Sequence, residues 1–386
     1  MEKTELEKLG AINTVGEVKQ QPQLWKEALK NYLTNKDRID TYLAMIASRH
    51  QKVRVIFTGA GTSAYVGDTV VPYLKGKVDE LTWELVSVPT TDIVSNPYEY
   101  LNADIPTLLL SFGRSGNSPE SMAAVDLGKK MIKDFYQLTI TCAKDGVLAK
   151  KSEKDEKNLL FLMPEGANDK GFAMTGSYTC MVLSTLFIFD PKTNDEKGKI
   201  VEALALMGED VIGREEEIKR MVDLDFNRVI YLGSGSLAGM TREAGLKLLE
   251  LTAGKIAMLF DSSLGFRHGP KSFVDEKTLV FVFTSNHPHT RKYDLDILDE
   301  VKGDQIAKYI CSLTVKGEEN FAGSAFSFDE ADSMIPDAYM ALPYVMFAQV
   351  LAVMAALKVG NRPDTPSPTG TVNRVVKGVN IHPYED

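Results

Sequence analysis

The chain has 386 residues, of which 44% are apolar and 25% are charged, which is the composition of an ordinary globular protein of two or three domains. Lys and Arg number 44 and Asp and Glu 53, so the formal net charge of −9 excludes an overall positive field for nucleic acid or an anionic membrane. The three cysteines, Cys142, Cys180 and Cys311, form no CxxC pair and have no metal-ligand spacing. They predict buried thiols in a reducing cytoplasm.

Two stretches bear on targeting. The N-terminus, MEKTELEKLG, lacks the basic start and apolar core of a signal peptide. Residues 341–357 are mostly apolar, but Pro343, Tyr344 and Gln349 interrupt them, and a membrane span needs about 20 apolar residues. We therefore predict a cytoplasmic protein in which this stretch is a helix buried in a core or a subunit interface.

Helical patterns open the chain, and strands alternating with helices follow. The N-terminal segment contains two apolar-periodic stretches, Gln23–Leu33 and Asp37–Ala47, that predict helices. Further on, short apolar strands are separated by helical segments such as Glu120–Lys133 and Ser177–Phe189. This alternation is typical of an α/β fold in which a parallel sheet is covered by helices on both faces.

Three apolar runs occur twice, in the same order. VIFTGAGTSA at Val55–Ala64 corresponds to VIYLGSGSLA at Val229–Ala238, and each contains a Gly-x-Gly turn. The other two pairs are TLLLS at Thr107–Ser111 with TLVFVF at Thr278–Phe283, and LTITC at Leu138–Cys142 with SLTV at Ser312–Val315. Because both order and spacing are kept, the sequence predicts two copies of one α/β domain.

These patterns divide the chain into four parts. The expected limits are 1–50 for an N-terminal helical segment, 51–190 for the first copy, 200–360 for the second copy and 361–386 for a C-terminal tail. The polar segment Pro191–Lys199 is a plausible linker between the copies. The tail begins with a proline-rich stretch, so we predict an extended segment that is either disordered or strapped across the body.

The first Gly-x-Gly turn is a candidate anion site. Gly59–Ala64 follows a strand and opens a helix, so the backbone amides of Gly61, Thr62 and Ser63 can face a phosphate. A dinucleotide-binding fingerprint has the same appearance, and Glu84, about 20 residues on, is then the candidate ribose ligand. The turn alone leaves both interpretations open.

A second loop is more specific. SFGRSGNSPE at Ser111–Glu120 lies between a strand and a helix, and it gathers a cation, two hydroxyls and an amide around Gly116. Hydroxyls together with helix N-terminal amides form a phosphate cup that needs no metal. The phosphate-binding candidates in this loop are Arg114, Ser115, Asn117 and Ser118. The alternative for Ser118 alone is an ordinary helix N-cap before Pro-Glu.

The second copy does not keep this loop. Its counterpart, Thr284–Thr290, reads TSNHPHT, without the Ser-Gly-Asn-Ser turn. We therefore expect one copy to bind the phosphate and the other to contribute different chemistry. His287 and His289 are two positions apart with no acidic partner nearby, which is more typical of loop residues than of ligands, so no metal is assigned.

Two segments of the second copy carry groups that can move protons. Glu243, Lys247 and Glu250 share one face of a predicted helix, as either a solvated salt-bridge face or an active-site face. His268, in Arg267-His-Gly-Pro270, carries an imidazole, a group whose unperturbed pKa of about 6.5 suits proton exchange with a sugar hydroxyl and ring oxygen. The histidine could equally be a turn residue.

The paired Gly-x-Gly turns and the Ser-Gly-Asn-Ser loop resemble sugar isomerase (SIS) domains, which bind phosphosugars. Tandem SIS domains of similar spacing form the isomerase half of glucosamine-6-phosphate synthase, and EVKQQP at Glu17–Pro22 resembles the start of that half. Over nearly the whole chain, the sequence is most similar to the galactosamine-6-phosphate deaminase/isomerase family. That family's pattern appears in SFGRSGNSPES (111–121), MTGSYT (174–179), GFRHGPKS (265–272) and PSPTGTVNRVVKGV (366–379).

The resemblance implies roles for individual residues. It implies that Glu250 shuttles a proton between C1 and C2 of the open-chain sugar, with Lys247 beside it on the active-site helix. His268 opens the sugar ring and is supplied by the neighbouring subunit, which implies a homodimer or homotetramer. Lys377 aligns loosely with the lysine that meets the sugar carbonyl in the synthase. The sequence departs from the synthase at Gly113 and Arg114, which replace a hydroxyl and an amide of its phosphate loop.

The resemblance implies conversion of galactosamine 6-phosphate and water to tagatose 6-phosphate and ammonia. This reaction needs neither a redox cofactor nor a metal, because one carboxylate can serve two adjacent carbons. No glutaminase domain precedes the SIS pair, which favours release of ammonia over its incorporation. The alternatives are a plain aldose–ketose isomerase, a fructosamine-phosphate deglycase, or a non-catalytic phosphosugar sensor.

Overall fold

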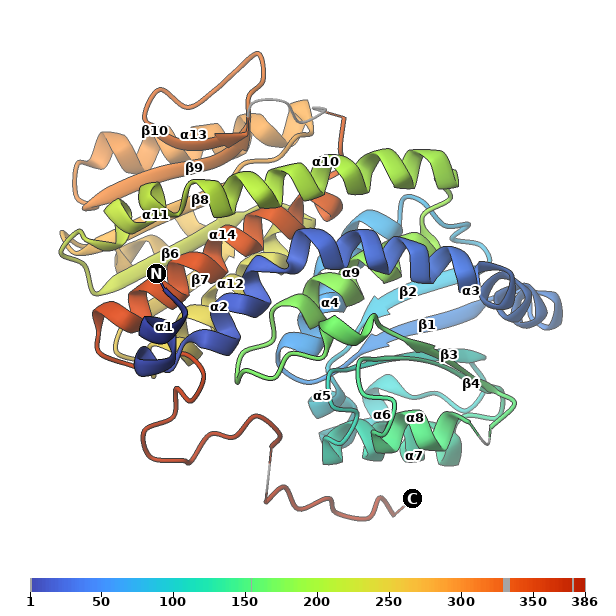
Figure 1. Cartoon of the computed structure of the whole chain (residues 1–386). Coiled ribbons are helices and arrows are strands. Elements are labelled where there is room, and N and C mark those ends of the chain that lie inside the picture. Colours follow the sequence, from blue (N-terminus) through green and yellow to red (C-terminus); the bar gives the residue numbers. More distant parts are fainter. Residues whose placement is uncertain (1, 154, 329–333, 377, 386) are drawn as a thin grey trace. The chain divides into compact units, whose positions relative to one another are not determined.

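The computed structural model, which describes residues 2–153, 155–328, 334–376 and 378–385, contains two compact units (Figure 1). Unit 1 comprises Met1–Gln23, Lys170–Thr175 and Gly198–Gly370. Unit 2 comprises Leu24–Asp169, Gly176–Lys197 and Thr371–Asp386. The boundary falls inside two helices, α3 (Gln21–Arg49) and α10 (Asn194–Gly213), so neither unit is one continuous segment.

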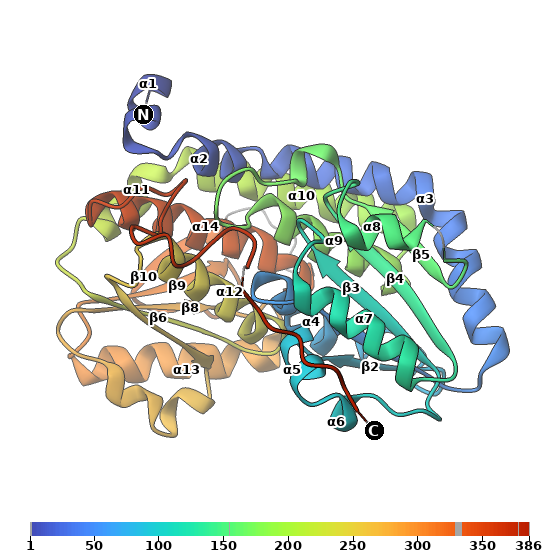
Figure 2. The same ribbon diagram turned by 90° about the horizontal axis from the view of Figure 1, so that it is seen from below.

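Unit 2 is built on a parallel sheet whose strand order is β2-β1-β3-β4-β5. The strands are β1 (Val53–Thr58), β2 (Trp83–Ser87), β3 (Thr107–Gly113), β4 (Phe135–Thr141) and β5 (Asn158–Leu162). The helices α4 (Thr62–Leu74), α5 (Thr90–Ser95), α6 (Pro97–Tyr100), α7 (Pro119–Met131), α8 (Val147–Ser152) and α9 (Gly176–Phe189) surround it (Figure 2).

Apolar side chains alternate between the two faces of this sheet, because successive residues of a strand point to opposite sides. On one face, Ile56 and Leu109 pack in a buried cluster with residues of α5, α7 and α8. On the other face, Phe57 of β1 contacts the ring of Phe112 and the ring of Phe189 of α9. The sheet is therefore covered on both sides, as the α/β prediction required.

Unit 1 repeats this topology. Its parallel sheet has the order β10-β9-β8-β6-β7, which is the unit 2 order read from the opposite edge. The strands are β6 (Arg228–Gly233), β7 (Ala257–Ser262), β8 (Thr278–Phe283), β9 (Tyr309–Val315) and β10 (Ser324–Phe328). The helices are α1 (Lys3–Leu9), α2 (Ile12–Lys19), α11 (Glu215–Val222), α12 (Ser236–Leu251), α13 (Pro288–Asp304) and α14 (Asp337–Lys358).

The apolar stretch near the C-terminus is the core helix α14 of unit 1. Tyr344 stacks on Phe283 of β8, Phe347 meets Phe281 of β8 edge-on, and α14 also packs along α12. It is long and apolar enough to cross a membrane, but 89% of its most apolar window is buried inside the protein. Burial on all sides explains why the helix is apolar all round.

The structure modifies two local predictions. The two helical stretches expected before residue 50 belong to the single helix α3, because the polar segment between them contains no Pro or Gly to end it. The expected linker Pro191–Lys199 contains the boundary between the units, after Lys197, but it is largely helical, since α10 begins at Asn194. Thr193 Oγ1 accepts from the Glu196 amide at 3.2 Å, and the Glu196 carboxylate accepts from the Thr193 amide at 2.8 Å. This capping box starts the helix.

The described part of the tail contains no helix or strand and is held at several points. Within unit 1, the Asp364 carboxylate accepts from the amide and the hydroxyl of Thr14, both at 2.8 Å. Within unit 2, Lys130 Nζ donates to the carbonyl of Tyr384 at 2.7 Å. Of the two conformations expected for the tail, the strapped one is observed in each unit.

Candidate active site

The strand order of unit 2 locates a ligand crevice. In an open sheet of order 2-1-3-4-5, ligands bind beyond the carboxyl ends of the strands at the point where the order reverses, between β1 and β3. Gly59–Gly61 follows β1 and Arg114–Ser118 follows β3. Both loops predicted to bind phosphate therefore lie at the switch point of one sheet.

The loop after β1 depends on glycine for its path. Gly61 has φ 56° and ψ −128°, a conformation that side chains rarely adopt, and it directly precedes α4. A Cβ on Gly59 would lie 2.6 Å from the backbone carbonyl carbon of Ser63. Thr62 and Ser63 form the first turn of α4 and are 4% and 5% exposed. The turn therefore presents the amino end of α4 at the switch point.

The loop after β3 is held by hydrogen bonds to the start of α8. Gly116 has φ 62°, and its carbonyl accepts from the Leu148 amide at 3.0 Å. The Asn117 side chain accepts from the Val147 amide at 2.9 Å, so this predicted phosphate ligand also caps α8. The Ser115 hydroxyl accepts from the Asn117 amide at a long 3.3 Å. Ser118 stands at the N-cap of α7, but its side chain makes no capping hydrogen bond, contrary to the N-cap alternative.

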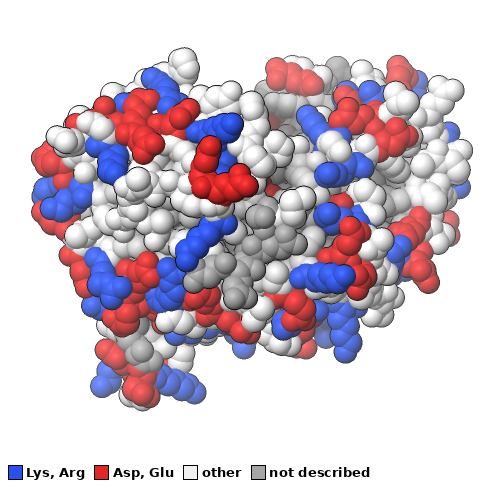
Figure 3. All heavy atoms as spheres, turned by 90° about the horizontal axis from the view of Figure 1, so that it is seen from above, with Lys and Arg blue, Asp and Glu red and all other residues white. Residues whose placement is uncertain are grey.

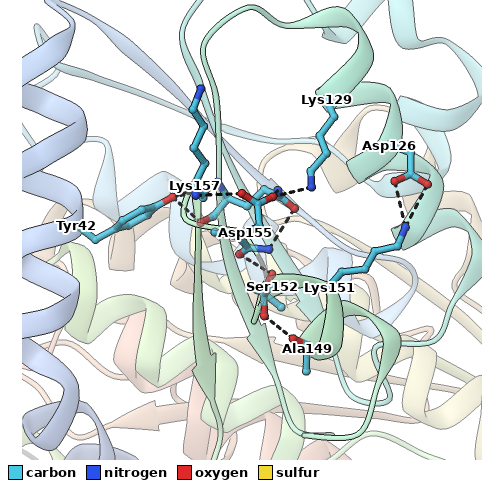
Figure 4. Close-up of polar contacts among 11 residues, drawn as sticks. Tyr42, Asp126, Lys129, Ala149, Lys151, Ser152, Asp155 and Lys157 are labelled. Atoms are coloured by element: carbon cyan, nitrogen blue, oxygen red, sulfur yellow. Dashed lines mark hydrogen bonds and ion pairs between the residues drawn. The ribbon is translucent and has the colours of Figure 1, made fainter.

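Ion pairs join α7 to α8 and to the segment that follows α8 (Figure 4). Lys151 of α8 binds Asp126 of α7 at 3.1 Å, and Lys129 of α7 binds Asp155 at 2.6 Å. The loop thus opens α7 and contacts the start of α8, and these two helices are joined by the Lys151–Asp126 pair.

Arg114, the predicted phosphate cation, is only 6% exposed, and its Nη2 donates to the carbonyl of Arg374 in the tail at 3.2 Å. Arg374 in turn donates to the carbonyl of Asp169. The Asp169 carboxylate accepts from the amide and hydroxyl of Ser177 in α9, at 3.0 and 2.5 Å. The phosphate loop, the tail and α9 therefore belong to one polar network in unit 2.

The corresponding loop of unit 1 is filled by carboxylates of the chain itself. Gly235 repeats the Gly61 turn with φ 56° and ψ −124°. Asp294 of α13 accepts from the Ser263 hydroxyl at 2.5 Å and the Ser285 amide at 2.9 Å. Asp337 accepts from the Asn286 amide at 2.8 Å. Because these donors are already bound, they are not available to a substrate phosphate.

Helix α12 carries the predicted proton-transfer group. Lys247 Nζ lies 2.7 Å from Glu250 Oε2 and 3.4 Å from Glu243 Oε1. Glu243 and Lys247 have side chains 0% and 1% exposed, whereas the Glu250 side chain is 23% exposed. The arrangement is not a solvated salt-bridge face, because a buried lysine charge is balanced by carboxylates and Glu250 alone reaches solvent.

His268 lies on an exposed turn of unit 1, at the end of a 3₁₀ segment (Gly265–Arg267). The next residue, Gly269, has φ 122°, and a second 3₁₀ turn begins at Pro270. The neighbouring Phe266 is completely buried in the cluster beneath α13. The turn is therefore anchored by Phe266 while the imidazole faces outward.

Two further candidate residues from the sequence are Lys377 and Glu84. Lys377 lies outside the described residues. Glu84 binds Arg54 Nε at 3.3 Å and Lys52 Nζ at 3.9 Å, which argues against a role as a ribose ligand. The strand order also argues against a dinucleotide site, because it differs from the order of a dinucleotide-binding sheet. On the surface seen in Figure 3, basic and acidic side chains are interspersed, without a large basic field.

Comparison with known proteins decides the family. The SIS domain model matches residues 225–358. The D-galactosamine-6-phosphate deaminase AgaS of Escherichia coli is 42% identical over 96% of both chains, and that of Shewanella sp. (strain ANA-3) is 40% identical over 98% of this chain and 94% of its own length. The crystal structure of tagatose-6-phosphate ketose/aldose isomerase from E. coli superposes with a TM-score of 0.86, with 39% identity over 97% of each chain.

The chain belongs to the AgaS family. Its fold, two α/β units with parallel sheets of one topology, is that of tandem SIS domains. The AgaS-family relationship extends over both copies, and the SIS domain model matches residues of the second copy.

Three residues near the AgaS-family motifs were missed from the sequence. Arg374 and Asp169 join the phosphate loop through contacts between positions 205 or more apart in the chain, which no local pattern reveals. Glu300, on α13, contacts both Arg267 and Lys271, on either side of His268. The only signal for Glu300 in the sequence was its acidic character on the polar face of an amphipathic helix.

Proposed function

We propose that this protein converts D-galactosamine 6-phosphate and water to D-tagatose 6-phosphate and ammonia. The observation that carries the proposal is the pairing of a partly exposed Glu250 with a fully buried Lys247 on α12, in a chain that shares more than a third of its residues with D-galactosamine-6-phosphate deaminases. A partly exposed carboxylate beside a buried cation suits proton transfer to and from a bound sugar. The donors at the unit 2 switch point suit a phosphate.

The proposed binding mode uses unit 2 for the phosphate. Ser115 and Ser118 donate hydroxyl hydrogen bonds to the phosphate oxygens, and the amino end of α4 at Thr62 and Ser63 adds its partial positive charge. Arg114 contributes positive charge from within the polar network rather than by direct contact. Asn117 holds the loop to α8, since its side-chain oxygen is already committed to the Val147 amide.

The proposed chemistry has three steps. His268 removes the proton of the C1 hydroxyl and protonates the ring oxygen as the C1–O5 bond breaks, giving the open-chain aldehyde. Glu250 then removes the proton from C2 and returns it to C1, while O1 gains one proton and the amino nitrogen loses one, so that the amine becomes a C2 imine. Water adds to the imine and ammonia leaves, which produces the ketose. Lys247 holds the Glu250 carboxylate in place through their 2.7 Å ion pair.

The experiment that tests the reaction measures ammonia release from a panel of hexosamine 6-phosphates with galacto and gluco configurations at C4. The proposal requires turnover of the galacto compound and formation of tagatose 6-phosphate in equal amount. Isomerisation of hexose 6-phosphates without ammonia release would replace it with the plain isomerase alternative. Binding without any turnover would support the non-catalytic sensor.

The role of Glu250 has its own test. Glu250→Gln keeps the size of the side chain but cannot accept the C2 proton, so kcat should fall by about 10²–10⁴-fold with little change in substrate affinity. Exchange of the C2 hydrogen with deuterated solvent should disappear with it. Glu209→Gln, on the exposed face of α10, is the matched control and should leave both rates unchanged. Near-normal exchange in Glu250→Gln would remove this residue from the mechanism.

We further propose that the enzyme acts in the cytoplasm as a homodimer or homotetramer. Three free, buried thiols are consistent with a reducing compartment. The exposed position of His268 suits a group that serves a neighbouring subunit. Sedimentation of the purified protein, together with restoration of activity on mixing inactive His268→Asn and Glu250→Gln variants, tests the shared site.

A further inference from the structure

The turn that carries His268 is closed by one carboxylate. Glu300 Oε2 lies 2.5 Å from Arg267 Nε, and Glu300 Oε1 lies 2.5 Å from Lys271 Nζ. Lys271 Nζ also lies 2.6 Å from Asp304 Oδ2, one helical turn further along α13. The two basic residues stand on either side of His268 in the chain, so a single side chain bridges both ends of the turn.

These contacts are more constrained than an ordinary surface ion pair. The Arg267, Lys271 and Glu300 side chains are only 27%, 26% and 35% exposed. Donation by Lys271 and Arg267 holds the pKa of Glu300 below its ordinary value. On the apolar side, Phe266 packs against Ile297 and Val301 of the same helix. The turn is thus fixed to α13 from both sides.

The backbone of the turn is irregular at His268. His268 has φ −90° and ψ 39°, outside the regular helix and strand regions, and it is followed by Gly269 at φ 122°. Gly269 adopts this positive φ readily, and the His268 amide donates to the Gly265 carbonyl at 2.9 Å. Since the imidazole is itself exposed, its position depends on how the turn as a whole is held against α13.

We propose that Glu300 is a positioning residue for ring opening, which orients His268 by bridging Arg267 and Lys271 and does not touch the substrate. This inference rests on the proposed function of His268. Misplacement of a reacting group by about 1 Å can cost roughly 10²-fold in rate. Loss of Glu300 should therefore slow ring opening and leave proton transfer at Glu250 intact.

The test compares two substrates. Galactosamine 6-phosphate is cyclic and needs ring opening, whereas its 4,5-dideoxy analogue has no hydroxyl that can close a five- or six-membered ring. Glu300→Gln should lower kcat on the cyclic substrate by about 10–100-fold with KM within about twofold, and should leave the rate on the open-chain analogue within about twofold. Glu300→Asp, which keeps the charge, should recover part of the loss.

The matched control is Glu217→Gln, which removes one of the two carboxylate partners of Arg214 from an ion pair of similar exposure in the same unit, with side chains 27% and 29% exposed. It should change neither rate. Lys271→Met leaves the Arg267–Glu300 contact in place and provides a milder variant should Glu300→Gln fold poorly, with a smaller loss confined to the cyclic substrate.

Two outcomes overturn the inference. An unchanged rate of Glu300→Gln and Lys271→Met on the cyclic substrate shows that the bridge does not position His268. An equal loss on both substrates shows a general disturbance of the site. If the unmodified enzyme releases no ammonia from any hexosamine 6-phosphate, the proposed function itself fails, so the two failures are distinguishable.

Discussion

A substitution at Gly146 should displace the predicted phosphate loop. It precedes α8 with φ −67° and ψ 153°, a conformation that alanine adopts without strain. A Cβ at this position would lie 2.3 Å from the carbonyl oxygen of Ser115, where real Cβ contacts essentially never fall below 3.0 Å. Gly146→Ala therefore requires a movement of at least 3.0 − 2.3 = 0.7 Å, either of Ser115 or of the start of α8.

A displacement of this size is enough to misalign hydroxyl donors that bind over a range of only a few tenths of an ångström. We expect the dissociation constant of a hexose 6-phosphate, measured by titration calorimetry, to rise about tenfold or more in Gly146→Ala. The stability cost should be about 1–3 kcal/mol, the usual range for overpacking.

The control is Gly198→Ala, because a Cβ on this α10 residue meets no atom within 4 Å. That variant should bind normally and gain about 0.5–1 kcal/mol of stability, as alanine does over glycine inside a helix. An unchanged dissociation constant in Gly146→Ala, with the expected loss of stability, would show that the phosphate binds elsewhere than at this loop.

Two further predictions concern titration. Burial raises the pKa of the thiols of Cys142, Cys180 and Cys311. A thiol reagent at neutral pH should therefore label none of the three in the native enzyme and all three in guanidinium chloride. Labelling of the native protein would contradict this prediction. Lys271 and Arg267 hold the pKa of Glu300 below its ordinary value of about 4.5 in the folded protein. The ionised carboxylate therefore stabilises the fold above the unfolded-state pKa of about 4.5, and this stabilisation is lost as the pH falls through the lower, folded-state pKa. The melting temperature of Glu300→Gln should lie below that of the unmodified enzyme at pH 7, and the gap should close on acidification; a gap that stays constant down to pH 3 refutes the argument.

The central strands could be predicted because they are buried on both faces. β3 and β8 are continuous apolar runs, and their repetition along the chain predicts the duplicated fold. The edge strands β2, β5, β7 and β10 were missed, because none of them is buried along its whole length. β7 follows a turn in which Ala253 has a positive φ of 52°, a conformation with no signal in the sequence.

The candidate site was partly predictable for a similar reason. Gly-x-Gly turns and the Ser-Gly-Asn-Ser loop are local, since the strand, the turn and the helix that form them are adjacent in sequence. The supports of these loops are not local. Arg114 is 260 positions from the tail carbonyl that it binds, and Glu300 is 33 positions from Arg267. Such pairings depend on how strands are ordered in the sheet, which periodicity alone does not fix.

The interleaving of the two units constrains the order in which the chain can fold during synthesis. Unit 1 contains both Met1–Gln23 and residues up to Gly370, and unit 2 contains Thr371–Asp386. Helices α1 and α2 are translated early, yet Asp364, which binds Thr14, follows 350 residues later. Neither unit can therefore be completed while the segment between its parts is still being synthesised, so the usual domain-by-domain order of folding does not apply. A fragment that contains only one copy would lack the N-terminal or C-terminal segment that belongs to its unit.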